Sequence, residues 1–470
     1  MGYRSVMKRA WPTLAIAATC IGACTDPTAR NASARSSVLG PQATLPVLEP
    51  PCQRDAEGRY HPSLQSVLDA AEPGGTVFAC DRSEGHPGPL VLRQDVSLVG
   101  PATVRGAAGP AIHVVGGRAT LVAMTLVGGT GAVEPRLDGD TFGGVVAAWE
   151  ADALAIRHST IRDGEADWGG CIAGPRRGPL HLHDTDVSNC TARKVGGAIW
   201  IRAGTLEDSL VRDSLAPFGG GVAVRSVDVT DGDVHLPGTE VVANHGSVQG
   251  GGMLITGPAR VIGGTVRDNT SEQGAGVMIA EATGGWLHGT AIGNVASVGG
   301  GGVFISGGSA TLRGVSIVEN TTSGDALPDG RGVGGGIWVA GDSTTTAVLF
   351  DVTLEGNEAS WGGGLMAAGS ATWSDGPQVD MHGGMLHTHT AEDGAGAAVV
   401  GARLLLDHTT VTDNAATTGG GVILERSRLD VFGGTWSGNS PTDITSEAGT
   451  YDGPIEGELI CDPSGCNAMP

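Results

Sequence analysis

The chain has 470 residues, 80 of them glycine, with a net charge of −22 at pH 7 and a pI near 4.8. The acidic balance argues against nucleic-acid binding, which depends on a basic surface that displaces counterions. The glycines follow no three-residue period and 40% of the residues are apolar, so the composition excludes collagen and full disorder. Many short strands joined by tight turns fit this composition.

The segment 1–23 has the pattern of an export signal. A positively charged start precedes an apolar run that is too short to cross a bilayer. The run closes with Ile21-Gly22-Ala23-Cys24, which resembles the lipobox of bacterial lipoproteins. The resemblance implies lipidation of Cys24. It also implies the outer membrane or cell surface, because Thr25 stands where Asp favours inner-membrane retention. An ordinary secretion signal with an incidental cysteine is the alternative.

The next segments are expected to be a tether, a cap and one long body. Residues 24–58 are rich in Pro, Ser, Ala and Thr without an apolar period, which predicts a flexible tether. A helical pattern over 63–71 that starts with Ser predicts a short capping helix over the first rung of the following structure. The body is expected to span 59–445, and 446–470 to form a Cys-containing tail or cap.

A glycine-led apolar motif recurs through most of the body. Two or three small residues precede an apolar strand, as in Gly300-Gly301-Gly302-Val303, at intervals of roughly 23 to 34 residues. Each period also holds two further short strands. Such a period is typical of a solenoid, in which a coil buries its apolar face only when the next coil stacks on it.

An asparagine usually lies 17 residues after the apolar anchor of the motif, as from Val277 to Asn294. Asparagine tolerates left-handed backbone at sharp turns, and stacked asparagines form hydrogen-bonded ladders. The predicted ladder consists of Asn189, Asn244, Asn269, Asn294, Asn320, Asn357, Asn414 and Asn439.

Together, the glycine motif and the apolar-x-x-Asn pattern are similar to the repeats of polymorphic outer-membrane proteins and related β-helices with the pectate-lyase-like fold. The resemblance covers roughly residues 60–445. It implies an all-β fold, a single-stranded right-handed parallel β-helix. Autotransporters of this type end in a membrane barrel, but 446–470 are polar, so the lipid is expected to be the membrane anchor.

Six cysteines remain after Cys20 and Cys24 are assigned to the signal and the lipid. An even number in an oxidising compartment predicts disulfides, although six cysteines allow fifteen connectivities. Sequence proximity favours Cys52–Cys80, Cys171–Cys190 and Cys461–Cys466. Zinc binding is the alternative, but the chain has no C-x-x-C pair.

One residue after each anchor should point outward between two inward apolar residues. Most of these positions are themselves large and apolar: Trp200, Leu254, Met278, Phe304, Trp338 and Met366. An outward apolar column is unusual unless it is covered or used. It is either a docking stripe for a glycan or a protein partner, or a surface that a loop or the C-terminal tail covers.

Two acidic loops are candidates for calcium binding. Asp138 and Asp140 lie in one long insertion, and Asp325 and Asp329 in the other. Solvated loops without an ion are the alternative.

Two histidine pairs have a spacing that a metal can use. His181-Leu182-His183 and His387-Thr388-His389 should each place two imidazoles on one strand face. Asp184 and Asp186 should then face the opposite side. Exposed histidines without a metal are the alternative.

The functional hypothesis is a lipid-anchored envelope protein without a cofactor that binds a polysaccharide or a surface protein without catalysis. The sequence lacks the Asn-Thr-Asp, Asp-Asp, Gly-His-Gly and Arg-Ile-Lys motifs sought for enzymes of this fold. A polysaccharide lyase or other carbohydrate-active enzyme is the first alternative, because a solenoid aligns acid and base groups from different rungs. A structural spacer is the second.

Overall fold

The structure is a computed structural model that describes residues 63–134, 139–226, 233–324, 331–369 and 375–447, with backbone also at 450–451, 459–462 and 465–468. The predicted signal, the tether, Cys24 and Cys52 lie outside the described residues.

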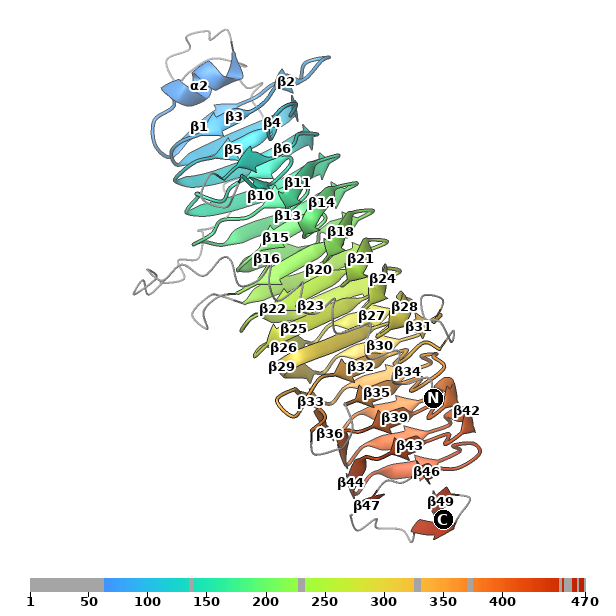
Figure 1. The fold of residues 1–470 in the computed structure, drawn as a ribbon. Coiled ribbons are helices and arrows are strands. Elements are labelled where there is room, and N and C mark those ends of the chain that lie inside the picture. The colour runs from blue at the N-terminus through green and yellow to red at the C-terminus, as the bar shows by residue number, and fades with distance from the viewer. Residues whose placement is uncertain are drawn as a thin grey trace.

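The N-terminal helix α2 (Leu64–Ala70) begins and ends close to its predicted limits. Ser63 caps it, because its hydroxyl accepts a hydrogen bond from the backbone N–H of Ser66 at 3.2 Å. Gln65 accepts from the Val91 backbone N–H at 2.7 Å and donates to the Val91 carbonyl at 3.0 Å. The helix therefore satisfies part of the exposed edge of the first rung, at one end of the molecule (Figure 1).

The body is a parallel β-solenoid of about 13 turns, which confirms the predicted fold class (Figure 1). Each coil contributes strands to two columns of one continuous sheet, and most coils add a strand to a third column. We name the columns the glycine face, the long face and the cover sheet.

The glycine face consists of the strands that follow the glycine motifs, paired in parallel through the molecule. They are β3 (Leu90–Leu92), β5 (Ile112–Val114), β9 (Val146–Ala147), β12 (Ile172–Ala173), β15 (Ile199–Ile201), β19 (Val222–Arg225), β22 (Met253–Thr256), β25 (Val277–Ala282), β29 (Val303–Arg313), β32 (Ile337–Ala340), β35 (Leu365–Ala368), β39 (Ala397–Val400), β43 (Val422–Glu425) and β46 (Ile444–Glu447).

The long face follows in each coil and is bent near its middle. Its strands are β1 (Gly75–Phe78), β2 (His86–Pro87), β4 (Val96–Arg105), β6 (Arg118–Val127), β10 (Ala153–Arg162), β13 (Leu180–Ser188), β16 (Gly204–Glu207), β17 (Leu210–Arg212), β20 (Val234–Val242), β23 (Arg260–Arg267), β26 (Gly285–Leu287), β27 (Thr290–Ile292), the end of β29, β30 (Ser316–Val318), β33 (Thr346–Phe350), β34 (Thr353–Glu355), β36 (Gln378–His382), β37 (Met385–His387), β40 (Arg403–Asp407), β41 (Thr410–Thr412), β44 (Arg428–Phe432), β45 (Thr435–Ser437) and β47 (Thr450–Tyr451).

The cover sheet is formed by the segments between the ladder positions and the glycines. Nine of its strands pair in sequence: β7 (Ala132–Val133), β8 (Thr141–Phe142), β11 (Glu165–Trp168), β14 (Thr191–Val195), β18 (Leu215–Phe218), β21 (His245–Gln249), β24 (Thr270–Gln273), β28 (Val295–Gly299) and β31 (Thr321–Thr322). The remaining two, β38 (Thr390–Asp393) and β42 (Ala415–Thr418), form a separate pair that isolated bridges through Glu358 and Trp361 connect to the nine. In the tail, β48 (Leu459–Asp462) and β49 (Gly465–Ala468) form an antiparallel hairpin that sets Cys461 opposite Cys466.

Two apolar cores run along the solenoid. The first fills the lumen with the anchors, such as Ile172 and Val303, and with inward residues of the long face. The second lies between the outer surface of the glycine face and the cover sheet. In it Phe304 stacks on Trp338 with ring centroids 4.3 Å apart. Most coils after β5 therefore bury apolar side chains on both sides of the glycine-led strand.

The glycine motif is explained by a turn and by a contact. Its first residue has a left-handed backbone, as in Gly250 with φ 67°, where the chain turns from the cover sheet into the glycine face. Its third residue lies against the ladder, because a Cβ added to Gly276 would come within 3.0 Å of the Asn294 Nδ2. A larger residue at Gly276 would collide with the Gly302 carbonyl oxygen of the next coil, 2.4 Å from the added Cβ, and press on the asparagine.

The ladder is continuous from Asn244 through Asn269, Asn294 and Asn320 to Asn357, and it resumes from Asn414 to Asn439. At each step both the backbone N–H and the side-chain amide of one asparagine donate to the Oδ1 of the next, at 2.8 and 3.2 Å for Asn244 and Asn269. His389 stands between the two asparagine runs and links them: its Nδ1 accepts from the Asn357 N–H at 3.0 Å, and its own N–H donates to the Asn414 Oδ1 at 3.0 Å.

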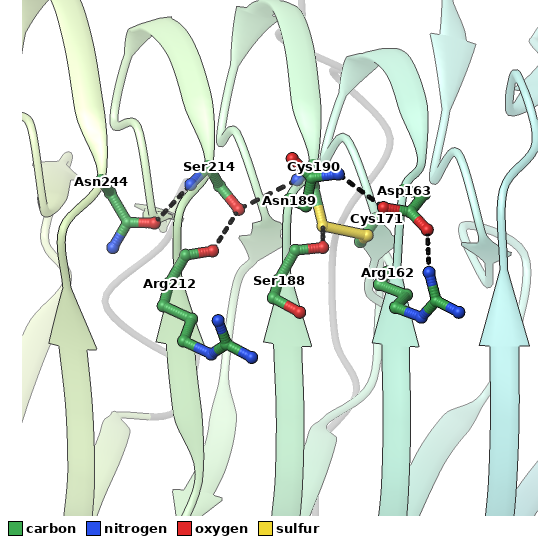
Figure 2. Close-up of a disulfide and its surroundings, with 9 residues drawn as sticks. All are labelled: Arg162, Asp163, Cys171, Ser188, Asn189, Cys190, Arg212, Ser214 and Asn244. Carbon is green, nitrogen blue, oxygen red and sulfur yellow. Dashed lines mark hydrogen bonds and ion pairs between the residues drawn. A yellow bond between two sulfur atoms is a disulfide. The ribbon is translucent and has the colours of Figure 1, made fainter.

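Asn189 lies outside this ladder, contrary to the prediction. It occupies the left-handed position one residue earlier, with φ 55°, and donates to Asp163. Cys190 takes the ladder position: its N–H donates to the Ser214 hydroxyl at 3.2 Å, and Ser214 donates to Asn244 at 3.0 Å (Figure 2). The 17-residue count misplaced this position because the coil is one residue longer.

The predicted disulfide Cys171–Cys190 is confirmed. Cys171 stands where other coils have the third glycine, and Cys190 where they have the asparagine, so the disulfide replaces the Gly–Asn contact with a covalent bond (Figure 2). Cys80 is also disulfide-bonded, and the predicted partner Cys52 lies outside the described residues.

Candidate functional site: a polar groove on the long face

A bend in the long face positions the polar side chains of the site. In three successive coils the bend residue is His158, Asp184 or Asp208, each with a left-handed backbone at φ between 46° and 49°. In the next coil the bend is Gly238, with φ 64°. Left-handed backbone costs a non-glycine residue roughly 1 kcal/mol, although Asp and His tolerate it better than most. Three adjacent coils therefore keep side chains where glycine is the less strained choice.

The bend also resets the strand alternation, so that residues on both sides of it project to solvent. Before the bend, Arg157 lies opposite His183, which lies opposite Glu207. After the bend, Asp186 lies between Thr160 and Leu210 on the neighbouring coils. These side chains are stacked at the rung spacing of about 4.8 Å.

The resulting groove has a volume of about 300 Å³, at the lower end of ligand-site volumes. It is lined by His158, Ser159, Thr160, Asp184, Thr185, Asp186, Asp208 and Leu210. Its floor is fixed by buried hydroxyls: Ser159 accepts from the Met124 N–H at 3.1 Å, and Ser209 accepts from the Thr185 N–H at 3.3 Å. A ligand would therefore meet a floor that is already ordered.

Most charged groups of the groove are engaged by a neighbour. The imidazole of His158 lies 2.9 Å from Asp184, measured from Nδ1 to Oδ2, and His183 Nδ1 lies 3.3 Å from Glu207 Oε2. Arg212 donates to Asp186 at 3.0 Å, and this hydrogen bond, followed by the one to Asp213, raises the pKa of the guanidinium. Asp208 has no hydrogen-bond or ion-pair partner among the described residues.

His181 lies on the same outer face as His183, two residues before it. Burial, followed by the nearby positive charge of Arg157, lowers the pKa of His181. This imidazole is therefore neutral at pH 7.

The predicted docking stripe is buried. Phe304 and Met278 have no exposed surface, and Leu254 retains 7%. The column does point away from the lumen, but the strands of the cover sheet pack on it, so the expectation of an exposed stripe is wrong. The cover is a sheet, where the sequence suggested a loop or the C-terminal tail. The six residues Trp200, Leu254, Met278, Phe304, Trp338 and Met366 belong to the second core.

The acidic loops are described only at Asp140, because Asp138, Asp325 and Asp329 lie outside the described residues. The Asp140 carboxylate accepts from Lys194 Nζ at 2.6 and 2.8 Å and from Trp168 Nε1 at 2.8 Å. These contacts tie the loop to the cover sheet.

The histidine pairs differ from expectation because of left-handed residues. The bend at Asp184 brings Asp184 and Asp186 to the outer side with His183, so the predicted opposite facing is wrong. In the other pair, Thr388 has φ 55°, which leaves His387 on the surface and places His389 in the ladder with no exposed area.

The sequence interpretation missed the groove, although the chain carries a signal for it. Each of the three bend residues is followed by a small buried hydroxyl residue: His158-Ser159, Asp184-Thr185 and Asp208-Ser209. A polar residue followed by Ser or Thr once per coil marks the bend, but only the folded coils show that the three neighbours share one groove.

No protein-family model, curated protein or solved structure matches the chain. Within the described part of the chain, every helix falls short of the length and apolar character needed to cross a membrane.

Proposed function

We propose that this protein is a lipid-anchored protein of the bacterial cell envelope that binds a polysaccharide in the polar groove of the long face. The supporting observation is the run of His158, Asp184 and Asp208 at three adjacent bends, where their side chains border a groove with an ordered floor. Polar side chains retained at strained positions are typical of binding sites.

Binding without cleavage is favoured by the pairing within the groove. Asp184 is engaged by His158, and Asp186 by Arg212. A general acid or base needs a proton-transfer group that is poised for the substrate, whereas these carboxylates are held as acceptors. As acceptors they suit the hydroxyl groups of a saccharide.

The anchor is the other part of the proposal. The lipobox-like end of the segment 1–23 supports attachment of a lipid at Cys24, and the tether 24–58 would hold the solenoid away from the membrane. A display of the groove toward extracellular or periplasmic polysaccharide follows from this arrangement.

The test is a glycan array probed with the full chain purified in mild detergent. Absorbance of unsaturated products is followed at the same time with soluble polysaccharides. We expect saturable binding to one class of polysaccharide without new absorbance, and at least tenfold weaker binding by the double variant Asp184→Asn, Asp208→Asn.

The matched control is Asp351→Asn, since Asp351 occupies the same bend position in a distant coil, with φ 51°. Asn tolerates left-handed backbone, so all three substitutions preserve the turn. Polysaccharide cleavage, or equal binding by the groove variant and the control, would refute the proposal.

A further inference from the structure

Three potential metal ligands converge at the rim of the groove. One ring nitrogen of His183 and one carboxylate oxygen from each of Glu207 and Asp208 all lie within 4.8 Å of one another. The register of β13 and β16 sets this arrangement, because His183 lies opposite Glu207 and Asp208 follows at the bend. We propose that His183, Glu207 and Asp208 hold a divalent transition-metal ion such as Zn²⁺.

The geometry requires only a small adjustment. Ligands bound at about 2.1 Å around a tetrahedral ion lie roughly 3.4 Å apart, so the donor atoms need to approach by on the order of 1 Å. The side chain of Glu207 is 52% exposed, which leaves it free to rotate by this amount. One imidazole with two carboxylates suits a transition ion, whereas calcium is bound through oxygen ligands.

His183 and Asp208 have room for a further partner within the described part of the chain. His183 Nδ1 is shielded from solvent and makes no hydrogen bond to any described residue, although Glu207 Oε2 lies 3.3 Å away. A Cβ on Gly238 would come within 2.1 Å of Asp208 Oδ1, so the glycine leaves the space that this carboxylate occupies. A dication would neutralise the two adjacent carboxylates, which otherwise repel each other.

The neighbouring pair restrains the histidine ligand. The ring of His158 packs edge-on against that of His183 with centroids 5.4 Å apart, and Asp184 fixes His158 by its hydrogen bond. Support of a ligand by neighbouring side chains is common around metal ions. Three protein ligands leave a coordination position open to the groove, where a hydroxyl or carboxylate of the saccharide would bind. This last step rests on the proposed function, but ion binding does not.

The test is titration of the EDTA-treated full chain in mild detergent with Zn²⁺ by calorimetry and with Co²⁺ by visible absorption. We expect one Zn²⁺ per chain at this site and the visible bands of four-coordinate Co²⁺. His183→Gln, Glu207→Gln and Asp208→Asn should each weaken Zn²⁺ binding at least tenfold. His181→Gln, two residues away on the same face, is the matched control and should bind as the unchanged chain does.

Lack of saturable Zn²⁺ binding up to millimolar concentration would overturn the inference, and so would equal affinity in the three variants and the control. The two proposals fail separately. Zn²⁺ binding lost in the variants, without any glycan binding, would sustain the metal site and refute the proposed function. Glycan binding that is unaffected by EDTA, with no Zn²⁺ binding, would do the opposite.

Discussion

Two regions of the long face contain the same backbone bend, but one forms an open groove and the other a cluster of paired side chains. In the groove region the bends are His158, Asp184 and Asp208, which border a groove and leave the Asp208 carboxylate without a partner among the described residues. In the coils from 311 to 412 the bends are Gly314, Asp351, Gly383 and His408, and the side chains just before these bends contact one another from coil to coil.

The second region is a chain of matched contacts. The Arg313 guanidinium lies 4.2 Å from the ring centroid of Phe350, which stacks on His382 with centroids 5.2 Å apart. His382 and His408 both contact Asp407, at 3.0 and 2.6 Å, and these two hydrogen bonds lower the pKa of its carboxyl. The comparison shows that one backbone repeat supplies either a closed surface cluster or an open site, depending on where the bends carry carboxylates.

The largest predicted effect concerns the disulfide in the groove region. Replacing both Cys171 and Cys190 with Ala should lower the free energy of unfolding by about 3 kcal/mol, because the bond closes a loop with a sequence separation of 19. Cys171→Gly with Cys190→Asn should recover about 1 kcal/mol of this, since it recreates the Gly–Asn contact of the other coils. Urea denaturation measures the free energy of unfolding of both double variants. Equal stability of the two would contradict the conclusion that the disulfide takes the place of the Gly–Asn contact.

The next effect tests the ladder of the second region by pH. Burial lowers the pKa of His389 from 6.5 to about 3, so the folded protein holds this imidazole neutral. The stability that depends on a neutral His389 is fully present above pH 6.5. It falls as the pH drops from 6.5 toward 3, because the unfolded chain then binds a proton that the folded protein does not. The loss is about 2 kcal/mol at pH 5. His389→Asn should flatten the decline in Tm between pH 7 and pH 5. An unchanged pH profile would show that His389 does not titrate as described.

Glycine at the bends should separate stability from function. Asp208→Gly and Asp351→Gly should each raise the free energy of unfolding by up to about 1 kcal/mol, because glycine adopts positive φ without strain. Asp208→Gly alone should also weaken glycan and Zn²⁺ binding. Thermal melts and the two binding assays on both variants decide this, and loss of binding in Asp351→Gly would place the site elsewhere.

The smallest predicted effect lies in the closed cluster. Arg313→Gln removes an exposed cation–π contact, so unfolding should become easier by about 0.5 kcal/mol and ligand binding should not change. A thermal melt and the glycan array are sufficient. A drop in glycan binding comparable to that of the groove variants would contradict the assignment of binding to the groove region alone.

The sequence predicted the solenoid because its main determinants are local. The glycine triplets mark a left-handed turn and a close contact, as Gly250 and the pair Gly276 and Asn294 show. The left-handed backbone expected at the ladder asparagines lies one residue earlier, as at Asp268 before Asn269. The repeat pattern predicts no strand between each asparagine and the next glycine motif, yet these segments form the cover sheet. Without that sheet, the column that includes Phe304 is predicted to be exposed. In the structure it forms part of the second core.

The candidate site was less predictable because it depends on register between coils. The sequence shows His183 and Asp184 side by side, but strand alternation predicts that they face opposite sides. The left-handed backbone at Asp184 reverses that assignment, and only the pairing of β13 with β16 brings Glu207 opposite His183.

The most direct test of the central claim is carbodiimide labelling of carboxylates, read by mass spectrometry, with and without the polysaccharide that binds best on the array. If the groove is the binding site, saturating polysaccharide should protect Asp184 and Asp208 and leave labelling of Asp351 unchanged. Protection of Asp351 with full labelling of Asp184 and Asp208 would contradict the account.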